Sequence, residues 1–150
     1  MGLLLEARLA LQADDLPGAR AGAEGAERGA RRHSWSGLQS HALSLLADVE
    51  ARDGQPGRAS LLARRALRLY EADGDRLGQG ACLMTLANAD WERGQLPQAI
   101  ESFRRALALF REEGEVLRQA NCLLALGSAC LLYTSPSPRD LSTSRMPSSA

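Results

Sequence analysis

Residues 94–113 read GQLPQAIESFRRALALFREE, and residues 54–73 read GQPGRASLLARRALRLYEAD. The second stretch lies forty positions before the first, and the two share residue types at many apolar and turn positions. The match continues beyond them, because Gly74 recurs as Gly114. A fixed period of between about 20 and 50 residues is typical of architectures in which small structural units stack on one another. The sequence therefore predicts a repeat protein with a unit of forty residues.

Each unit is predicted to contain two α-helices. In the second half of one unit, Ala99, Phe103, Ala106 and Phe110 follow the three-and-four spacing of an amphipathic helix. Before them, residues 94–97 have the composition of a turn, since Gly can adopt the left-handed conformation that ends a helix and Pro fits the first turn of the next. The pattern indicates helix pairs joined by short turns.

The helices of a pair are predicted to meet at small residues, because two helices approach closely only where side chains are short. Ala99 and Ala106 occupy such positions, and Phe103 is expected to fill the space between the two helices of its unit. The matching position one unit earlier is Ala63, so that unit is expected to be less tightly packed. Gly74 and Gly114 are expected to end helices between units.

Composition supports an all-α fold. The chain has 27 Leu and 25 Ala but only one Ile and two Val, so its aliphatic content lies in helix formers rather than in strand formers. It has no lysine, which excludes a phosphate-binding loop of the GxxxxGK[ST] type and lysine-dependent Schiff-base chemistry. Its 18 scattered arginines are matched by 18 acidic residues, a balance that argues against a nucleic-acid-binding surface.

No catalytic, metal or cofactor site is predicted. Cys82, Cys122 and Cys130 form no CxxC pair, and no His stands at ligand spacing from them. Adjacent acidic residues lie at predicted helix ends, where they are better explained by capping than by acid–base catalysis. No apolar run approaches the roughly 20 residues that a membrane span needs. We therefore expect a cytoplasmic protein that is not an enzyme and does not bind membranes.

One unit resembles the tetratricopeptide repeat. It has a Leu followed by a small residue, then Gly, Ala, an aromatic residue and Ala at the family's spacing, namely Leu86, Ala87, Gly94, Ala99, Phe103 and Ala106. The resemblance covers residues 1–129 in units of about 1–34, 35–74, 75–114 and a truncated 115–129. It implies a right-handed α-solenoid of antiparallel helix pairs with about seven helices. The unit is longer than the usual roughly 34 residues, and its first-helix aromatic is displaced to Trp91.

The resemblance also implies a partner-binding groove lined by the first helix of each unit. The groove positions in this chain are His41, Ser44, Asp48, Arg52, Met84, Asn88, Trp91, Asn121 and Leu124. Asn88 matches a position at which some family members bind a peptide backbone or carboxylate, but Met84 stands where the accompanying lysine would be. A Met and a Trp favour an apolar or aromatic peptide. The alternative is that both side chains simply pack between units.

Three functions follow from this reading, one of which is a non-catalytic piece of an enzyme. The first is a protein-interaction scaffold that binds a peptide or a helix of a partner protein and has no catalytic role of its own. The second is the sensor or transducing arm of a larger bacterial transcription regulator or signalling ATPase, because the long repeat resembles the arms of such proteins. A helix-turn-helix or phosphate-loop segment elsewhere in the full protein would decide between them.

The last stretch, residues 130–150, differs abruptly from the Ala, Leu and Arg pattern before it. It reads CLLYTSPSPRDLSTSRMPSSA, a Ser- and Pro-rich composition that predicts a disordered tail. Its beginning and its end also resemble a translated sequencing-library adapter, so we expect an artefact here and a natural sequence that continues beyond the fragment. The alternative is a genuine linker. A unit truncated at residue 129 is expected to leave apolar surface through which the chain self-associates.

Overall fold

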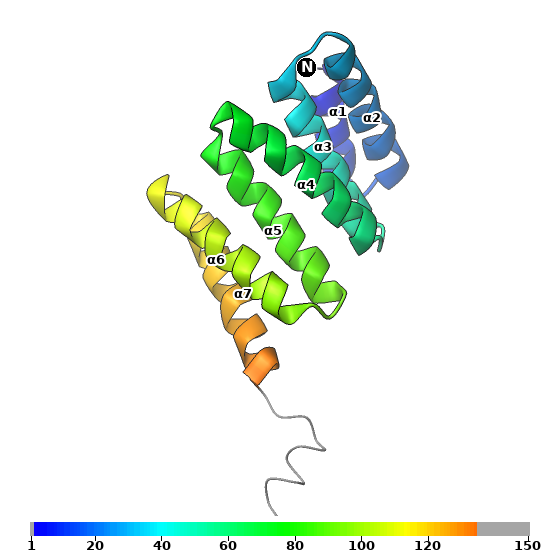
Figure 1. The fold of residues 1–150 in the computed structure, drawn as a ribbon. Coiled ribbons are helices and arrows are strands. Elements are labelled where there is room, and N and C mark those ends of the chain that lie inside the picture. The colour runs from blue at the N-terminus through cyan, green and yellow to red at the C-terminus, as the bar shows by residue number, and fades with distance from the viewer. Residues whose placement is uncertain (1, 135–150) are drawn as a thin grey trace, which may run out of the picture.

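The computed structural model describes residues 2–134, and within this range the chain is all-α (Figure 1). Seven helices follow one another along the described residues, with no strand among them. They are α1 (Gly2–Gln12), α2 (Leu16–Arg32), α3 (Ser36–Arg52), α4 (Pro56–Asp73), α5 (Arg76–Glu92), α6 (Leu96–Glu112) and α7 (Val116–Thr134). The expectation of an all-α fold is confirmed.

Consecutive helices run antiparallel and pack in chain order. At the start of α3, the Ser36 hydroxyl donates a hydrogen bond to the carboxylate of Asp73 at the end of α4, at 3.2 Å. At the start of α5, Arg76 forms ion pairs with Glu112 and Glu113 at the end of α6. A polar contact therefore links the beginning and the end of each of two successive helix pairs, a hydroxyl–carboxylate hydrogen bond in one and ion pairs in the other.

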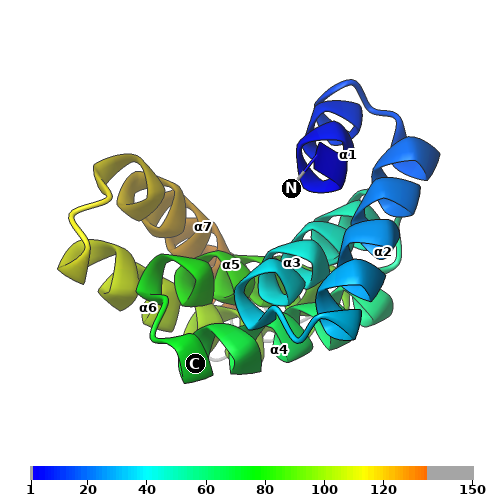
Figure 2. The same ribbon diagram turned by 90° about the horizontal axis from the view of Figure 1, so that it is seen from above.

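The odd-numbered helices line the inner side of an arc. Figure 2 shows α1, α3, α5 and α7 on this side, with α2, α4 and α6 outside them. Contacts between α1 and α3 and between α3 and α5 connect the inner helices directly. The arrangement gives the array a concave face built from the first helix of each forty-residue unit.

The predicted glycine turns are confirmed. Gly54, Gly74, Gly94 and Gly114 all have positive φ angles of 72° to 76°, in the left-handed region that residues with a Cβ rarely adopt. At Gly94 this conformation lets the Gln95 amide donate to the Asp90 carbonyl at 2.8 Å, which satisfies a carbonyl at the end of α5. Glycine thus ends four of the helices at equivalent places.

The apolar core runs through the array as three clusters. The largest joins α3 to α7 and contains both Tyr70 and Phe110. A second holds α1 and α2 against α3 and consists of Ala, Leu and Val side chains. The third places Phe103, fully buried, between Ala87 of α5 and Ala99 of its own helix, which confirms its expected role as filler.

The last described helix extends into the stretch predicted to be a tail. Helix α7 continues to Thr134, beyond residue 130 at which the tail was expected to begin. Cys130, Leu131 and Leu132 are compatible with a helix, and the first residue that would break it is Pro136. Because a helix needs only acceptable local propensity to continue, the change in composition at residue 130 does not end it. The remainder of the expected tail, residues 135–150, lies outside the described residues.

Candidate partner-binding face

A shallow pocket of about 200 Å³ opens on the concave face. Three inner helices contribute to its wall, together with the end of α6. Its lining residues are Asp48 of α3, Ala81, Met84 and Thr85 of α5, Phe110 of α6, and Arg118 and Asn121 of α7. Of the predicted groove residues, Asp48, Met84 and Asn121 are therefore brought together. No single helix pair forms this pocket, so it depends on the stacking of units.

Asp48 links α3 to α5. Its carboxylate accepts a hydrogen bond from the Thr85 hydroxyl at 3.0 Å. Burial raises the pKa of Asp48 above its usual value of 3.8, and the opposing effects of the Thr85 hydrogen bond and of the charges on Arg52 and Arg8 are smaller. The carboxyl is thus a partly desolvated acceptor on one side of the pocket.

The rest of the pocket combines apolar surface with one cation and one amide. The Met84 sulfur lies 3.2 Å from the Cys122 sulfur, so this side chain both packs against α7 and faces the pocket. Arg118 places its guanidinium carbon 5.5 Å from the centre of the Phe110 ring, a cation–π distance. Asn121 is exposed beside them and can both donate and accept hydrogen bonds.

Other predicted groove residues make structural contacts outside the pocket. Arg52 donates to the backbone carbonyl of Leu11 at 2.8 Å, which satisfies the end of α1. His41 is exposed, but its Nδ1 shares a hydrogen bond of 2.9 Å with the Tyr70 hydroxyl. Trp91 packs against the cluster around Phe103, as the packing alternative for this residue anticipated. Their helical spacing places these three residues on the inner face, as predicted. Each side chain, however, contacts a neighbouring helix and does not line the pocket.

Ser44, Asn88 and Leu124 complete the predicted set. Ser44 is half-buried. Burial raises the pKa of the nearby Cys82 thiol to about 12, and the opposing effect of Ser44 is smaller. A thiol with so high a pKa stays protonated and is a poor nucleophile. Asn88 and Leu124 are exposed on α5 and α7, outside the lining of the pocket.

Sequence reasoning missed Thr85, Phe110 and Arg118 as pocket residues. Thr85 lies one turn after Ala81 and one position after Met84, so a wider helical stripe would have included it. Arg118 occupies the position forty residues after Gly78, and this replacement of a glycine by a charged residue was a visible signal. Phe110 belongs to a second helix, and only the packing of α7 on α6 brings it to this face.

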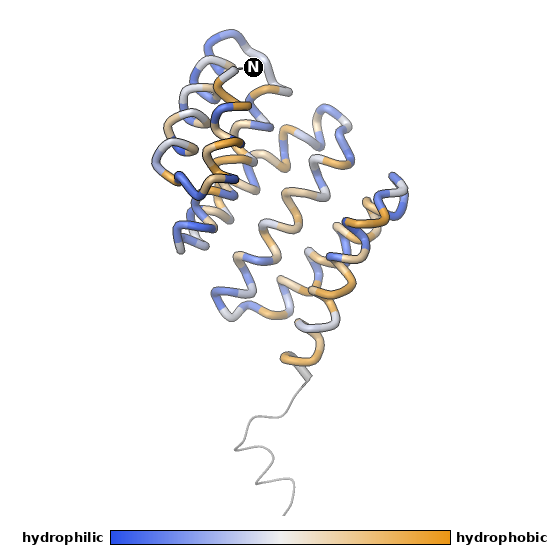
Figure 3. Tube along the Cα trace, turned by 180° about the vertical axis from the view of Figure 1, so that it is seen from behind, coloured by the Kyte–Doolittle hydropathy of each residue, from blue (hydrophilic) through white to orange (hydrophobic). Residues whose placement is uncertain are grey.

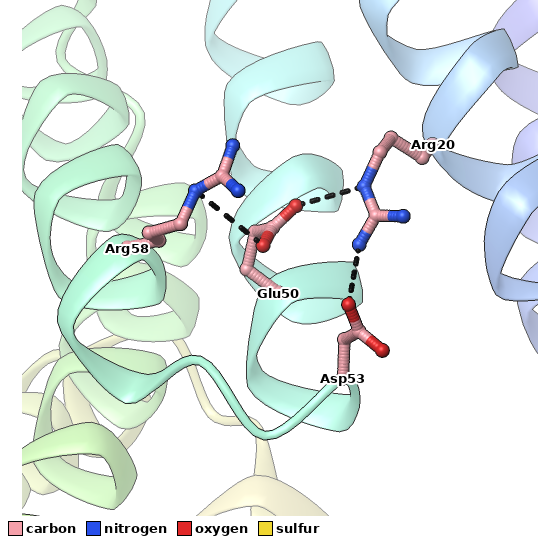
Figure 4. A network of polar contacts seen from close by, with 4 residues as sticks. All are labelled: Arg20, Glu50, Asp53 and Arg58. Carbon is pink, nitrogen blue, oxygen red and sulfur yellow. Dashed lines mark hydrogen bonds and ion pairs between the residues drawn. The ribbon is translucent and has the colours of Figure 1, made fainter.

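A buried ion-pair network was also missed (Figure 4). Glu50 is only 2% exposed, and its carboxylate accepts a hydrogen bond from Arg20 Nε of α2 at 2.9 Å. The same guanidinium reaches Asp53 at 2.9 Å, while Arg58 of α4 lies 3.7 Å from the second Glu50 oxygen. These contacts tie α2, α3 and α4 together. The forty-residue period gave one signal for this network. Asp90 stands forty residues after Glu50, and both acidic side chains are buried.

Within residues 2–134 no three metal-binding side chains converge, and none of the helices has the length and apolar character needed to cross a membrane. Comparison with known proteins returned no match, either to a family model or to a curated sequence.

Proposed function

We propose that this chain is a protein-interaction scaffold of the tetratricopeptide kind whose concave face binds a peptide segment of a partner protein. The observation that carries the proposal is the pocket to which α3, α5 and α7 contribute Asp48, Met84 and Asn121. A surface of this kind arises only when successive units stack, and stacked helical repeats commonly use their concave side for binding.

The repeat type and the handedness belong to the same proposal. We take the array to be a right-handed solenoid of tetratricopeptide-like units. The forty-residue period, the antiparallel pairing of consecutive helices and the inner row of odd-numbered helices in Figure 2 support this assignment.

The pocket favours an extended peptide with an apolar side chain at its centre. Met84 and Phe110 offer apolar surface, and the flexible thioether of Met adapts to different shapes. Asn121 can hydrogen-bond to both the N–H and the C=O of a peptide backbone. Asp48 and Arg118 place opposite charges around the same pocket, which would fix the direction in which a peptide with polar flanks lies.

A peptide-display selection tests the proposal even while the partner is unidentified. Random peptides are selected on the full chain, and the enriched peptides are synthesised and titrated against variants. Asn121→Arg adds a bulky charge to the pocket and is expected to weaken binding by roughly tenfold or more. The control is Leu61→Arg on α4, because Leu61 is 65% exposed and lies outside the pocket. Failure to enrich any peptide, or equal binding to both variants, would contradict the proposal.

A further inference from the structure

The pocket on the concave face has a counterpart one unit earlier, where a ring occupies the equivalent place. There the Nδ1 of His41 on α3 lies 2.9 Å from the hydroxyl oxygen of Tyr70 on α4. The two ring centres are 5.4 Å apart, with an angle of 77° between the planes. Forty residues later the equivalent pair is Ala81 of α5 and Phe110 of α6, and both line the pocket. Ala81 therefore supplies only a methyl group where the earlier unit has an imidazole.

The two units also differ on the next inner helix. Tyr70 packs against Gly78 of α5, where an added Cβ would lie 2.3 Å from its ring. The equivalent of Gly78 is Arg118, whose guanidinium carbon lies 5.5 Å from the centre of the Phe110 ring. Arg118 is the only charged residue within α7 (Val116–Thr134), a helix that is largely hydrophobic in Figure 3. The later unit thus has an exposed guanidinium at the pocket where the earlier one has a close backbone contact.

Two groups around the pocket favour an aromatic ring over a saturated one. The planar guanidinium of Arg118 lies over the Phe110 ring, and its other side can stack on a second ring. The Met84 thioether can make favourable contacts with the edge of an aromatic ring. The pocket volume of about 200 Å³ is sufficient for such a ring, since an apolar cavity of roughly 150 Å³ holds benzene.

The part of the chain that the structure describes does not supply this second ring. Apart from Phe110 in the wall, none of its aromatic side chains lines the pocket. Trp91 packs against the cluster around Phe103. Trp35 is 57% exposed, but its ring already stacks on His33, with the ring centres 4.9 Å apart. The ring is therefore expected from a partner molecule rather than from these residues or from Trp35 of a second copy.

We propose that the pocket is a subsite for one aromatic side chain of the partner peptide, and that Ala81 keeps this subsite open. The inference rests on the proposed function and adds the class of residue that the pocket selects. The ring lies beside the Ala81 methyl group and stacks on the guanidinium of Arg118. Asp48 and Asn121 remain available for hydrogen bonds with the peptide backbone. An aliphatic side chain gains the same burial but no cation–π contact, so the subsite prefers an aromatic ring to a saturated ring of equal size.

The probe is N-acetylphenylalanine amide, titrated into the ¹⁵N-labelled full 150-residue chain and followed by NMR at the side-chain N–H groups of Arg118 and Asn121. The comparison compound is N-acetylcyclohexylalanine amide, whose ring has the same number of carbon atoms but no π electrons. Because the saturated ring is the more hydrophobic, a pocket that recognises only apolar surface would prefer it. We expect the phenyl compound to bind about three- to tenfold more tightly, and its ring current to shift the Arg118 Nε–H resonance.

Two variants locate the ring. Ala81→His supplies the side chain that position 41 carries one unit earlier, so far-UV circular dichroism should show a folded chain. It is expected to weaken binding of the phenyl compound by about tenfold or more, because the imidazole occupies the subsite. Arg118→Gln removes the cation from an exposed position and is expected to abolish the preference for the phenyl compound. The matched control, Ala108→His, places the same side chain at an exposed position of α6 outside the pocket and should leave binding unchanged.

Three results would overturn the proposal. One is the absence of any shift at Arg118 or Asn121 up to the solubility limit of the phenyl compound. Another is equal or tighter binding of the cyclohexyl compound to the natural chain, or binding of the phenyl compound that Ala81→His leaves unchanged. The third is a dimer of the chain alone, detected by sedimentation and abolished by Ala81→His, because a second copy would then fill the pocket.

The peptides enriched in the display selection separate this proposal from the proposed function. If cyclohexylalanine replaces their aromatic residues without loss of affinity while Asn121→Arg still weakens binding, the aromatic subsite is refuted and the peptide-binding function stands. If the phenyl compound binds as expected but no peptide is enriched, the subsite for an aromatic ring stands and the peptide-binding function is refuted.

Discussion

The α1–α2 pair and the α5–α6 pair occupy equivalent places in the first and third units, but they are packed with side chains of different size. In the first pair, Gly22 lies so close to α1 that a Cβ there would be 2.9 Å from the Ala7 Cβ. In the third pair, Phe103 is fully buried between the helices. One architecture thus accepts either close contact of small residues or an aromatic filler.

The two pairs also differ in their turns and polar ties. Asp14 and Ser34 adopt positive φ angles of 61° and 57° where later units use glycine, which costs backbone free energy. The first pair is tied to α3 by Arg20, which bonds the buried Glu50. The comparison indicates that the N-terminal pair relies on polar contacts and close backbones, whereas the third pair relies on aromatic packing.

The largest loss of stability is expected when the aromatic side chain between α5 and α6 is removed. Phe103→Ala should lower the free energy of unfolding by about 3–5 kcal/mol, because it leaves a cavity between α5 and α6. Ala63→Gly, at the equivalent position of the previous unit, should cost only about 1 kcal/mol. Urea denaturation followed by circular dichroism measures both. Similar losses of unfolding free energy for the two variants would mean that aromatic and small-residue packing stabilise their units equally.

The next test breaks the polar tie of the first pair. Arg20→Ala should cost about 1–3 kcal/mol, since Glu50 is 2% exposed and would keep only the longer contact to Arg58. Asp53→Ala removes the other partner of Arg20, but its side chain is 45% exposed, so the expected loss is below about 1 kcal/mol. The same urea titrations compare them. An equal loss for both variants would show that burial of Glu50 does not decide the strength of the tie.

The turns provide a smaller, reciprocal test. Gly74→Ser should destabilise the chain by about 1 kcal/mol, because serine is strained at a φ of 72°. The reverse change one unit earlier, Ser34→Gly, should stabilise it by about 0.5–1 kcal/mol. Thermal unfolding of the two variants should therefore shift in opposite directions. Shifts of the same sign would mean that the surroundings of each turn outweigh the backbone conformation.

The smallest effect is a dependence on pH. Burial raises the pKa of Asp90 above its usual 3.8, and the charges of Arg64 and Arg93 oppose this less strongly. The folded state then binds this proton more tightly than the unfolded state, so stability should fall as pH rises from about 3.8 through the folded pKa. Asp48 acts in the same direction. Urea midpoints at a series of pH values should fall less steeply in Asp90→Asn, and least in the double variant with Asp48→Asn.

If the double variant had the same pH dependence of stability as the natural chain, the dependence could not be assigned to Asp90 and Asp48. Asp90 and Glu50 stand at equivalent positions of successive units, but their contacts with arginine differ. The nearest Asp90 ion pair is Arg93 at 4.0 Å, whereas Arg20 bonds Glu50 at 2.9 Å.

Several features of the fold could be predicted from local sequence. The all-α class, the glycine turns and the burial of Phe103 follow from composition, backbone conformation and helical spacing, which act within a few residues. The end of α7 could not be located from composition, because the change after Ala129 does not itself stop a helix, and α7 continues to Thr134.

The pocket was predicted only in part. Helical spacing places Asp48 and Arg52 one turn apart on the inner side of α3, yet Asp48 faces the pocket and Arg52 bonds the end of α1. Sequence by itself determined the repeat, the helix pairs and their turns, because these depend on local propensity and on a regular period. Only the tertiary structure decided which polar side chains remain accessible to a ligand. Their accessibility depends on which neighbouring helix contacts each of them when the units stack.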